Sequence, residues 1–226
     1  MKHGKNYRES LKKYNSENNY SLEEALGLVK TMAFAKFDET VDLSVKLNLK
    51  KSQTVRDTVV LPHQFKGEKK ILVFCKPEKE KEAQEAGAAF VGADDLIEKV
   101  KGGWTEFDVA VATPDMMKDV GKLGMVLGRK GLMPNPKTGT VTFDLKSTLA
   151  ELKKGRTEFR ADKTGVVHLA IGKVSMAPEP LAENVMAVMA EIKRKRPADA
   201  KGEYIKSVSV ASTMGPGVWV SITDQE

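Results

Sequence analysis

The spacing of apolar residues changes twice along this chain of 226 residues, and that double change constrains the fold most. Near the N-terminus, TVDLSVKLNL (40–49) alternates apolar and polar residues, which predicts a strand with one buried face. In the middle, KKILVFC (69–75) is continuously apolar, as expected for a strand buried on both faces. The alternating pattern returns in VVHLAIGK (166–173). We therefore predict one α+β domain made from the two outer parts of the chain, with a mostly parallel α/β domain inserted into it.

Local signals place the elements of these two domains. Ser21 and Glu24 form a capping box, which begins a helix that reaches about residue 33. Residues 1–20 are polar and basic, and predict a mobile arm or a weakly packed helix. Residues 156–173 are typical of a hairpin with its turn at 162–165. Further helices are expected at 77–87, 94–103, 114–128, 147–155 and 178–197.

Composition limits the cellular compartment and the kind of binding partner that we expect. The net charge is +6 and the isoelectric point about 9.2, which favours an anionic partner, although many solvated surfaces are also basic. Aromatic residues are only 6% of the chain, so a broad base-stacking platform is not expected. The single cysteine, Cys75, lies in an apolar run and is expected to be a buried thiol in a reducing, cytosolic setting. The N-terminus resembles no signal peptide, and no membrane span is predicted.

The segment GRKGLMPNPKTGTV (128–141) predicts a shaped, irregular loop, because prolines fix φ and glycines allow positive φ. Arg129, Lys130 and Lys137 give this loop a positive face. The glycines match neither a P-loop nor a dinucleotide-binding motif, so a bound nucleotide phosphate is disfavoured. Contact with a larger anion and a purely structural role for the loop both stay open.

The sequence gives little support to catalysis. His3, His63 and His168 have no metal-ligand spacing, and no motif suggests a nucleophile. We predict a protein that is not an enzyme and has no cofactor and no metal. A nucleotide-binding α/β enzyme is the disfavoured alternative.

Three polar clusters follow the ends of predicted elements in the split domain: AKFDET (35–40), EFRADKTGVVH (158–168) and STMGPG (212–217). Their side chains suit a folded RNA, because cations can meet phosphates, hydroxyls can reach ribose 2′-OH groups, and glycines let the backbone approach. Each cluster alone could be an ordinary turn. They can converge only if both outer parts of the chain share one sheet. The run KRKRP (193–197) either contacts phosphate or complements the end of a helix.

The chain resembles the L-one family of ribosomal proteins, which form the mobile stalk of the large subunit. The segments that carry the resemblance are AKFDETV (35–41), GLMPNPKTGTV (131–141), EFRADKTGVVH (158–168) and STMGPGV (212–218), together with VATPDMM (111–117), EAGAAFVGADDLIEKVKGGW (85–104) and ADAKGEYIKSV (198–208). The resemblance implies an α+β split antiparallel RNA-binding domain (1–66 and 157–226). It also implies an inserted three-layer α/β/α Rossmann-like domain (67–156), joined to the first by a hinge. The segment KKSQT (50–54) departs from the family pattern, because it is shorter than the usual bacterial loop at this place.

The resemblance also implies partners. They are the stalk region of 23S rRNA within the large ribosomal subunit, tRNA leaving the E site, and the mRNA leader of the protein's own operon, whose translation it would repress. The protein is then cytoplasmic, without a membrane partner, and monomeric when free. A free-standing repressor without a ribosomal role stays an alternative. The implied RNA-binding residues are Glu24, Lys36, Phe37, Glu39, Thr40, Arg160, Asp162, Lys163, Thr164, Gly165, His168, Ser212, Thr213, Met214, Gly215 and Pro216.

Overall fold

The structure, a computed structural model, describes residues 4–50, 53–65, 67, 69–197 and 202–221. Packing divides the chain into two compact units. Unit 1 combines Met1–Phe65 with Glu158–Glu226, and unit 2 is Lys66–Thr157. Lys66, the expected last residue before the insertion, lies outside the described residues, as do Lys51 and Ser52 of the short loop and part of the segment 198–208. The assignment of the two domains stays a prediction.

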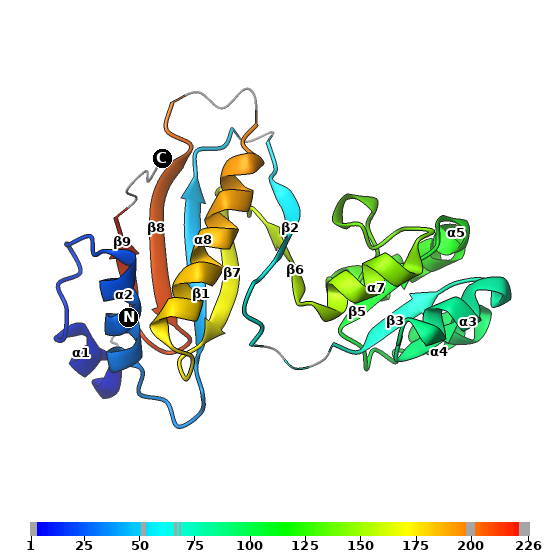
Figure 1. Cartoon of the computed structure of the whole chain (residues 1–226), viewed down its shortest axis with the longest axis horizontal. Coiled ribbons are helices and arrows are strands. Elements are labelled where there is room, and N and C mark those ends of the chain that lie inside the picture. The colour runs from blue at the N-terminus through cyan, green and yellow to red at the C-terminus, as the bar shows by residue number, and fades with distance from the viewer. Residues whose placement is uncertain (1–3, 51–52, 66, 68, 198–201, 222–226) are drawn as a thin grey trace. The chain divides into compact units, whose positions relative to one another are not determined.

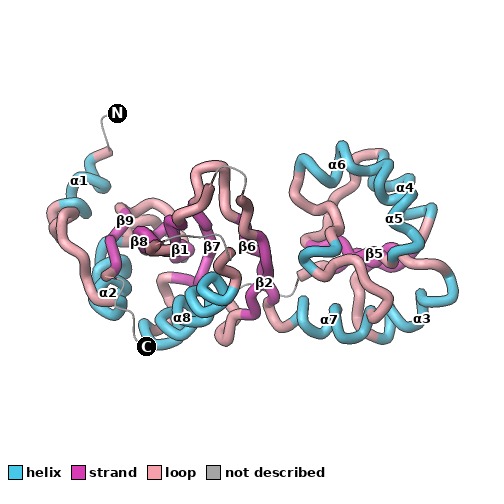
Figure 2. The backbone as a smooth tube through the Cα atoms, turned by 90° about the horizontal axis from the view of Figure 1, so that it is seen from above, coloured by secondary structure: helices cyan, strands magenta, loops and turns pink. Residues whose placement is uncertain are grey.

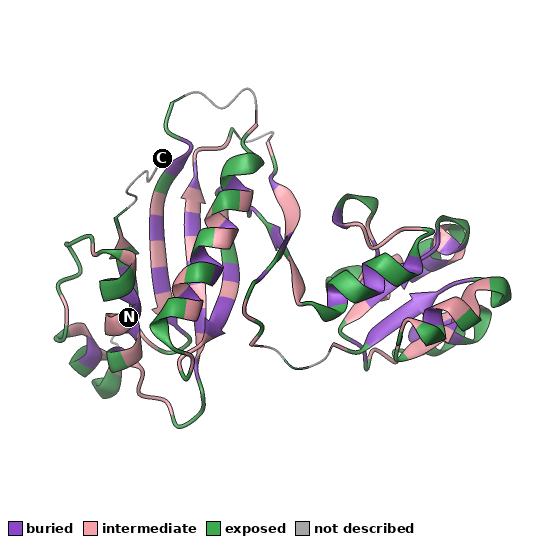
Figure 3. Ribbon diagram, viewed as in Figure 1, coloured by how far each residue is buried: buried purple, intermediate pink, exposed green. Residues whose placement is uncertain are grey.

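Unit 1 is built on a four-stranded antiparallel sheet with the order β7-β1-β8-β9. Its strands are β1 (Thr40–Leu47), β7 (Val166–Lys173), β8 (Ile205–Ser212) and β9 (Gly217–Val220). Burial alternates along β1 and β8, as Figure 3 shows by colour. The expected alternation therefore places one face of the sheet in the core.

Two helices, α2 (Leu22–Met32) and α8 (Pro178–Arg194), lie along the same face of this sheet (Figure 2). The predicted capping box at Ser21 and Glu24 begins α2 and is confirmed. Leu26 and Val188, from the two helices, are each at most 1% exposed and pack in one core with strand residues such as Leu43. Each such side chain contributes roughly 1.5–3 kcal/mol when it leaves water.

The N-terminal segment forms a short helix, α1 (Lys5–Leu11), so of the two expectations the structure shows the helix. The Ser10 hydroxyl donates to the backbone oxygen of Met32 at 3.0 Å. The Tyr14 hydroxyl donates to the oxygen of Gly217 at 2.9 Å. These two bonds attach the segment to the end of α2 and to the start of β9.

The hairpin expected over 156–173 is wrong, because its two strands do not pair with each other. β6 (Arg156–Arg160) pairs with β2 (Arg56–Val60) in a separate two-stranded sheet, whereas β7 joins the main sheet. Ala161 marks the divergence, because its N–H donates to the oxygen of Val55 at 2.8 Å. Among the described residues, only an isolated bridge between Ala161 and Val167 joins the two segments. A turn does lie at Asp162–Gly165, but it sends the chain from one sheet to another.

Unit 2 has a three-stranded parallel sheet in the order β4-β3-β5, covered by helices on both faces (Figure 2). Its strands are β3 (Ile71–Phe74), β4 (Phe90–Gly92) and β5 (Val109–Ala112). On β3, Leu72 and Phe74 face one apolar cluster, and Ile71 and Val73 face the other. The continuous apolar run thus reflects burial on both sides, and Cys75 is buried as expected.

The helices of unit 2 are shorter than expected near its middle. The helical segment predicted at 114–128 is confirmed, but it is divided into four short helices, with changes of helix type at Gly121 and Gly124, where the missing side chains weaken an α-helix. The helices of the unit are α3 (Pro77–Glu85), α4 (Asp94–Lys101), η1 (Pro114–Met116), α5 (Met117–Val120), η2 (Gly121–Leu123), α6 (Gly124–Arg129), η3 (Pro136–Thr138) and α7 (Leu145–Lys153).

Candidate nucleic-acid interface

The three polar clusters lie at two opposite ends of the main sheet. Val41 pairs with Ser212, so the loop before β1 and the turn after β8 meet at one end. Lys46 pairs with Val166, so the turn at 162–165 lies at the other end of β1 (Figure 1). The five residue steps from Val41 to Lys46 span roughly 17 Å of strand. The outer parts do share one sheet, as the expectation required, but the clusters do not converge at a single point.

We call residues 34–40 and 212–216 the composite loop, because hydrogen bonds join them. Thr40 N–H donates to the Thr213 hydroxyl at 2.9 Å, and this hydroxyl donates back to the Thr40 oxygen at 3.1 Å. Lys173, at the end of β7, donates to the Thr40 hydroxyl at 2.9 Å and to the Asp38 oxygen at 3.2 Å. The composite loop is therefore ordered by its own contacts.

The composite loop separates its candidate residues into an outer and an inner set. Phe37 is 55% exposed and Met214 is 51% exposed, and Lys36 and Thr213 are exposed beside them. Glu39, Ser212 and Pro216 are buried. Gly215 is half-buried, and a Cβ there would lie 2.5 Å from the Ser212 hydroxyl, which would have to move to make room for it. Apolar side chains next to a cation suit a sugar or base beside a phosphate.

The second cluster is a tight turn, residues 162–165, that we call the Asp162 turn. Asp162 Oδ1 accepts from the N–H groups of Thr164 and Val166, each at 2.8 Å, and the Thr164 hydroxyl donates to the same carboxylate. The Val166 N–H and the Thr164 hydroxyl hold the pKa of Asp162 below its ordinary value. Gly165 has a φ of 80°. The carboxylate and the glycine thus fix the turn that carries Lys163.

Lys163 and Arg160 are both exposed near this turn. Lys46, from the neighbouring strand, donates to the Thr164 oxygen and adds a third cation. Positive charge therefore gathers at this end of the sheet, where phosphates can be neutralised.

The sheet face opposite α2 and α8 joins the two ends; of its polar residues, the sequence reasoning included His168 but missed Ser44 and Ser209. Across its middle run His168, Ser44, Ser209 and Trp219, each paired with the next. His168 Nδ1 lies 2.9 Å from the Ser44 hydroxyl. The polar positions of the alternating strands were the available signal, because they mark the face that the core leaves uncovered.

Glu24 lies apart from both clusters. Its carboxylate accepts from the Ser21 N–H at 3.1 Å at the start of α2, whereas the composite loop follows the end of that helix. The structure thus gives Glu24 a helix-capping role and does not bring it to the other candidates.

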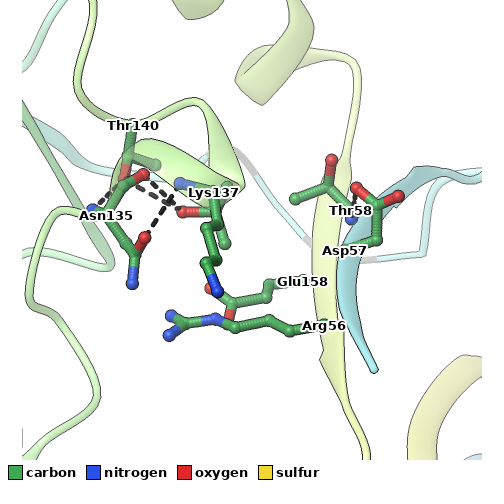
Figure 4. A network of polar contacts seen from close by, with 8 residues as sticks. Arg56, Asp57, Thr58, Asn135, Lys137, Thr140 and Glu158 are labelled. Atoms are coloured by element: carbon green, nitrogen blue, oxygen red, sulfur yellow. Dashed lines mark hydrogen bonds and ion pairs between the residues drawn. The ribbon is translucent and has the colours of Figure 1, made fainter. Parts of the chain in front are cut away.

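In unit 2, the loop Gly128–Val141 is held by its own polar groups, as Figure 4 shows around Asn135. The Asn135 N–H donates to the Thr140 hydroxyl at 2.7 Å, and the Asn135 side chain accepts from the Lys137 N–H at 2.8 Å. Arg129 and Lys137 are exposed, and Lys130 donates to the Thr105 hydroxyl. The contacts of these cations with an anion stay a prediction.

The cysteine and the acidic residues that the structure describes belong to the residue types that form reactive and metal-binding sites. Burial raises the pKa of Cys75 to about 11, so its thiol stays protonated at neutral pH. Within the described ranges, no group of histidine, cysteine and acidic residues could hold a metal ion. No helix in the same part of the chain is long and apolar enough to cross a membrane.

These features define a class, a mixed α/β protein with one split unit and one inserted unit, whose ordered polar loops present cations, hydroxyls and a few apolar side chains. Comparison with known proteins places the chain within that class. The model of the Ribosomal protein L1p/L10e family matches residues 29–216, and the chain belongs to this family. It is a family of structural ribosomal proteins, not of enzymes.

Curated relatives cover nearly the whole chain. The Large ribosomal subunit protein uL1 of Treponema denticola is 66% identical over 220 residues, 97% of each chain. Its counterpart in Treponema pallidum subsp. pallidum is 57% identical over 226 residues, the full length of both. That of Borrelia duttonii is 58% identical over 217 residues, 96% of this chain and 97% of the relative.

Proposed function

We propose that this protein is a structural constituent of the large ribosomal subunit, in the cytoplasm, and that unit 1 binds 23S rRNA directly. The observation that carries the proposal is the pair of ordered clusters on one sheet, the composite loop at one end and the Asp162 turn at the other. The kinship with proteins named as large-subunit components supports it. Because both clusters are held by internal hydrogen bonds, binding would need little ordering of the protein.

The proposed contacts divide by chemistry. Lys36, Arg160 and Lys163 would neutralise phosphates, since they are exposed and cationic. The Thr213 hydroxyl would reach a ribose 2′-OH, and Phe37 and Met214 would pack on a sugar or base. RNA bound at both ends of the sheet would lie along the polar face that contains Ser44 and Ser209.

The finer roles follow from the family resemblance. Unit 2 would be a Rossmann-like domain that moves on a hinge as part of the mobile stalk and helps deacylated tRNA leave the E site. The same surface of unit 1 would bind the mRNA leader of the protein's own operon and repress its translation. Both RNA targets would then compete for one site.

The test is filter binding of the purified protein to a 23S stalk fragment across a salt series, beside a scrambled RNA of equal length. Tight binding that survives moderate salt and fails on the scrambled RNA is expected. Equal binding to both RNAs that salt removes would mean a generic polyanion surface and would refute a specific site. Sedimentation of cell extracts separates the ribosomal role from a free repressor, which would not migrate with large subunits.

A further inference from the structure

We propose that Glu39 is a positioning residue that fastens the two halves of the composite loop together, so that the RNA meets Phe37 and Met214 already in place. Glu39 then acts from inside the protein rather than by touching RNA. This role rests on the proposed function of the composite loop. It replaces the direct RNA contact that the family resemblance implied for this residue.

The carboxylate of Glu39 bridges two distant segments. Its Oε1 accepts from the backbone N–H of Phe34 at 3.0 Å and of Ala35 at 2.8 Å, both in the loop after α2. Its Oε2 accepts from the N–H of Met214 at 3.0 Å, in the turn after β8. Residues 39 and 214 are 175 positions apart in the chain. One side chain thus fixes both halves of the loop.

The Glu39 backbone and the neighbouring Asp38 side chain make further hydrogen bonds. The oxygen of Glu39 accepts from the N–H of Val174 at 2.9 Å, beside the end of β7. The carboxyl of Asp38 accepts from the Ser175 N–H at 3.1 Å and from the Ser175 hydroxyl at 2.8 Å. The loop before β1 is therefore anchored toward β7 on one side and toward β8 on the other.

Burial rules out a direct contact with RNA. Glu39 is 1% exposed, so RNA cannot reach its carboxylate without opening the loop. Burial raises the pKa of Glu39, but the N–H groups of Ala35 and Met214, with the Ser212 hydroxyl and the Phe34 N–H, lower it more. The group is therefore a carboxylate at neutral pH, and a carboxylate can only accept hydrogen bonds. Three N–H donors converging on two oxygens require such a group.

Glu39→Gln tests this geometry with little change in shape. The amide keeps one oxygen, which can still serve Phe34 and Ala35, but its NH₂ then faces the N–H of Met214, and two donors cannot bond. The turn after β8 should loosen while α2 and the sheet remain. We expect the affinity for the 23S stalk fragment to fall about tenfold.

A double-mutant cycle distinguishes positioning from general weakening. If Glu39 acts through Met214, then Glu39→Gln combined with Met214→Ala should lower affinity no more than the stronger single variant. Glu39→Gln combined with Lys163→Ala, at the other end of the sheet, should multiply the two effects. Asp57→Asn removes another carboxylate of unit 1, which is paired with Lys195, and serves as the matched control with unchanged affinity.

Independent effects of Glu39→Gln and Met214→Ala would overturn the positioning role. If neither Met214→Ala nor Lys163→Ala weakens binding, the proposed RNA site itself is wrong, and the role proposed for Glu39 is then wrong too.

Amide hydrogen exchange tests the proposal without RNA. In Glu39→Gln, the Met214 N–H should exchange faster, while the Thr213 N–H, which donates to the Thr40 oxygen at 3.0 Å, should stay protected. Unchanged protection of Met214 would also overturn the proposal.

Discussion

Thr40 and Thr213 hold each other through three hydrogen bonds, although 173 positions separate them in the chain. The Thr213 hydroxyl both accepts from the Thr40 N–H and donates to the Thr40 oxygen, and the Thr213 N–H donates to that oxygen as well. One hydroxyl thus completes the junction between the first and last parts of unit 1, on the exposed side of the composite loop.

Thr213→Val keeps the shape of the side chain and removes two of these bonds. Because water can replace them in part at this exposed position, we expect a loss of about 1 kcal/mol in unfolding free energy. RNA affinity should also fall, since the hydroxyl is a proposed 2′-OH contact. Urea unfolding and filter binding measure the two effects. Thr31→Val, which removes a hydroxyl bond within α2, is the control, and an equal loss of RNA affinity there would contradict the assignment.

Met214→Asp should weaken binding to the stalk fragment by about 2–3 kcal/mol, because it places an unpartnered charge in a contact that binding dries. Met186→Asp makes the same change on α8, where the side chain is 54% exposed against 51% for Met214. Stability should change little in both variants, and only Met214→Asp should affect binding. Near-native affinity of a folded Met214→Asp protein would remove this residue from the site.

Gly165→Ala should destabilise unit 1 by roughly 1–2 kcal/mol, because an alanine pays a steric penalty at positive φ. The φ of Gly165 is 80°, and a Cβ there would lie 3.0 Å from the oxygen of Leu47. Gly27→Ala is the opposite case, because Gly27 lies within α2 and an added Cβ there would have no atom within 4 Å. That variant should stabilise by about 0.5–1 kcal/mol. Thermal unfolding of the two variants measures both changes in stability. An unchanged stability of Gly165→Ala would contradict the claim that this turn requires glycine.

Acid should weaken unit 1 partly through Asp57. Burial raises the pKa of this carboxyl, but the hydrogen bond from Lys195, at 2.6 Å, and the N–H of Thr58 (Figure 4) lower it more. The folded-state pKa therefore lies below the ordinary value of 3.8. Between these two values the unfolded chain binds more protons, so stability rises with pH through that window. The contribution is complete above the ordinary pKa and is lost as the pH falls through the folded-state pKa.

Urea unfolding between about pH 6 and about pH 3 measures this contribution. The stability of Asp57→Asn should fall less over that range than the stability of the unchanged protein. Parallel curves would show that Asp57 has the same pKa in both states.

Local signals in the sequence predicted local structure well. The capping box at Ser21 and Glu24 needs only residues three positions apart, and the apolar run that ends at Cys75 reports its own burial. The helical segment expected at 114–128 is present, but the local pattern did not reveal that it changes helix type at Gly121 and Gly124.

Long-range relationships could not be predicted in the same way. Strand register decides that the Asp162 turn lies at the far end of β1, and register depends on pairing between segments more than 100 positions apart. The hydrogen bond from the Met214 N–H to Glu39 joins two residues that no local pattern connects. The place of Glu39 beside Lys36 and Phe37 in a polar segment is equally typical of a surface carboxylate. Sequence reasoning therefore found the loops of the candidate site but not the roles of the residues within them.

Lys163→Ala should reduce the salt dependence of RNA binding, because each phosphate contact contributes about one unit to the slope of log K against log salt. Lys163 is exposed on the Asp162 turn, whose geometry depends on Asp162 and not on Lys163. The substitution should therefore leave the turn intact, and the slope should fall by about one. Lys81→Ala removes the same charge from an exposed position on α3 in unit 2, so it corrects for net charge. Filter binding over a salt series compares the three proteins. If Lys163→Ala and Lys81→Ala change the slope equally, Lys163 makes no specific phosphate contact, and the Asp162 turn would lose its place in the RNA site.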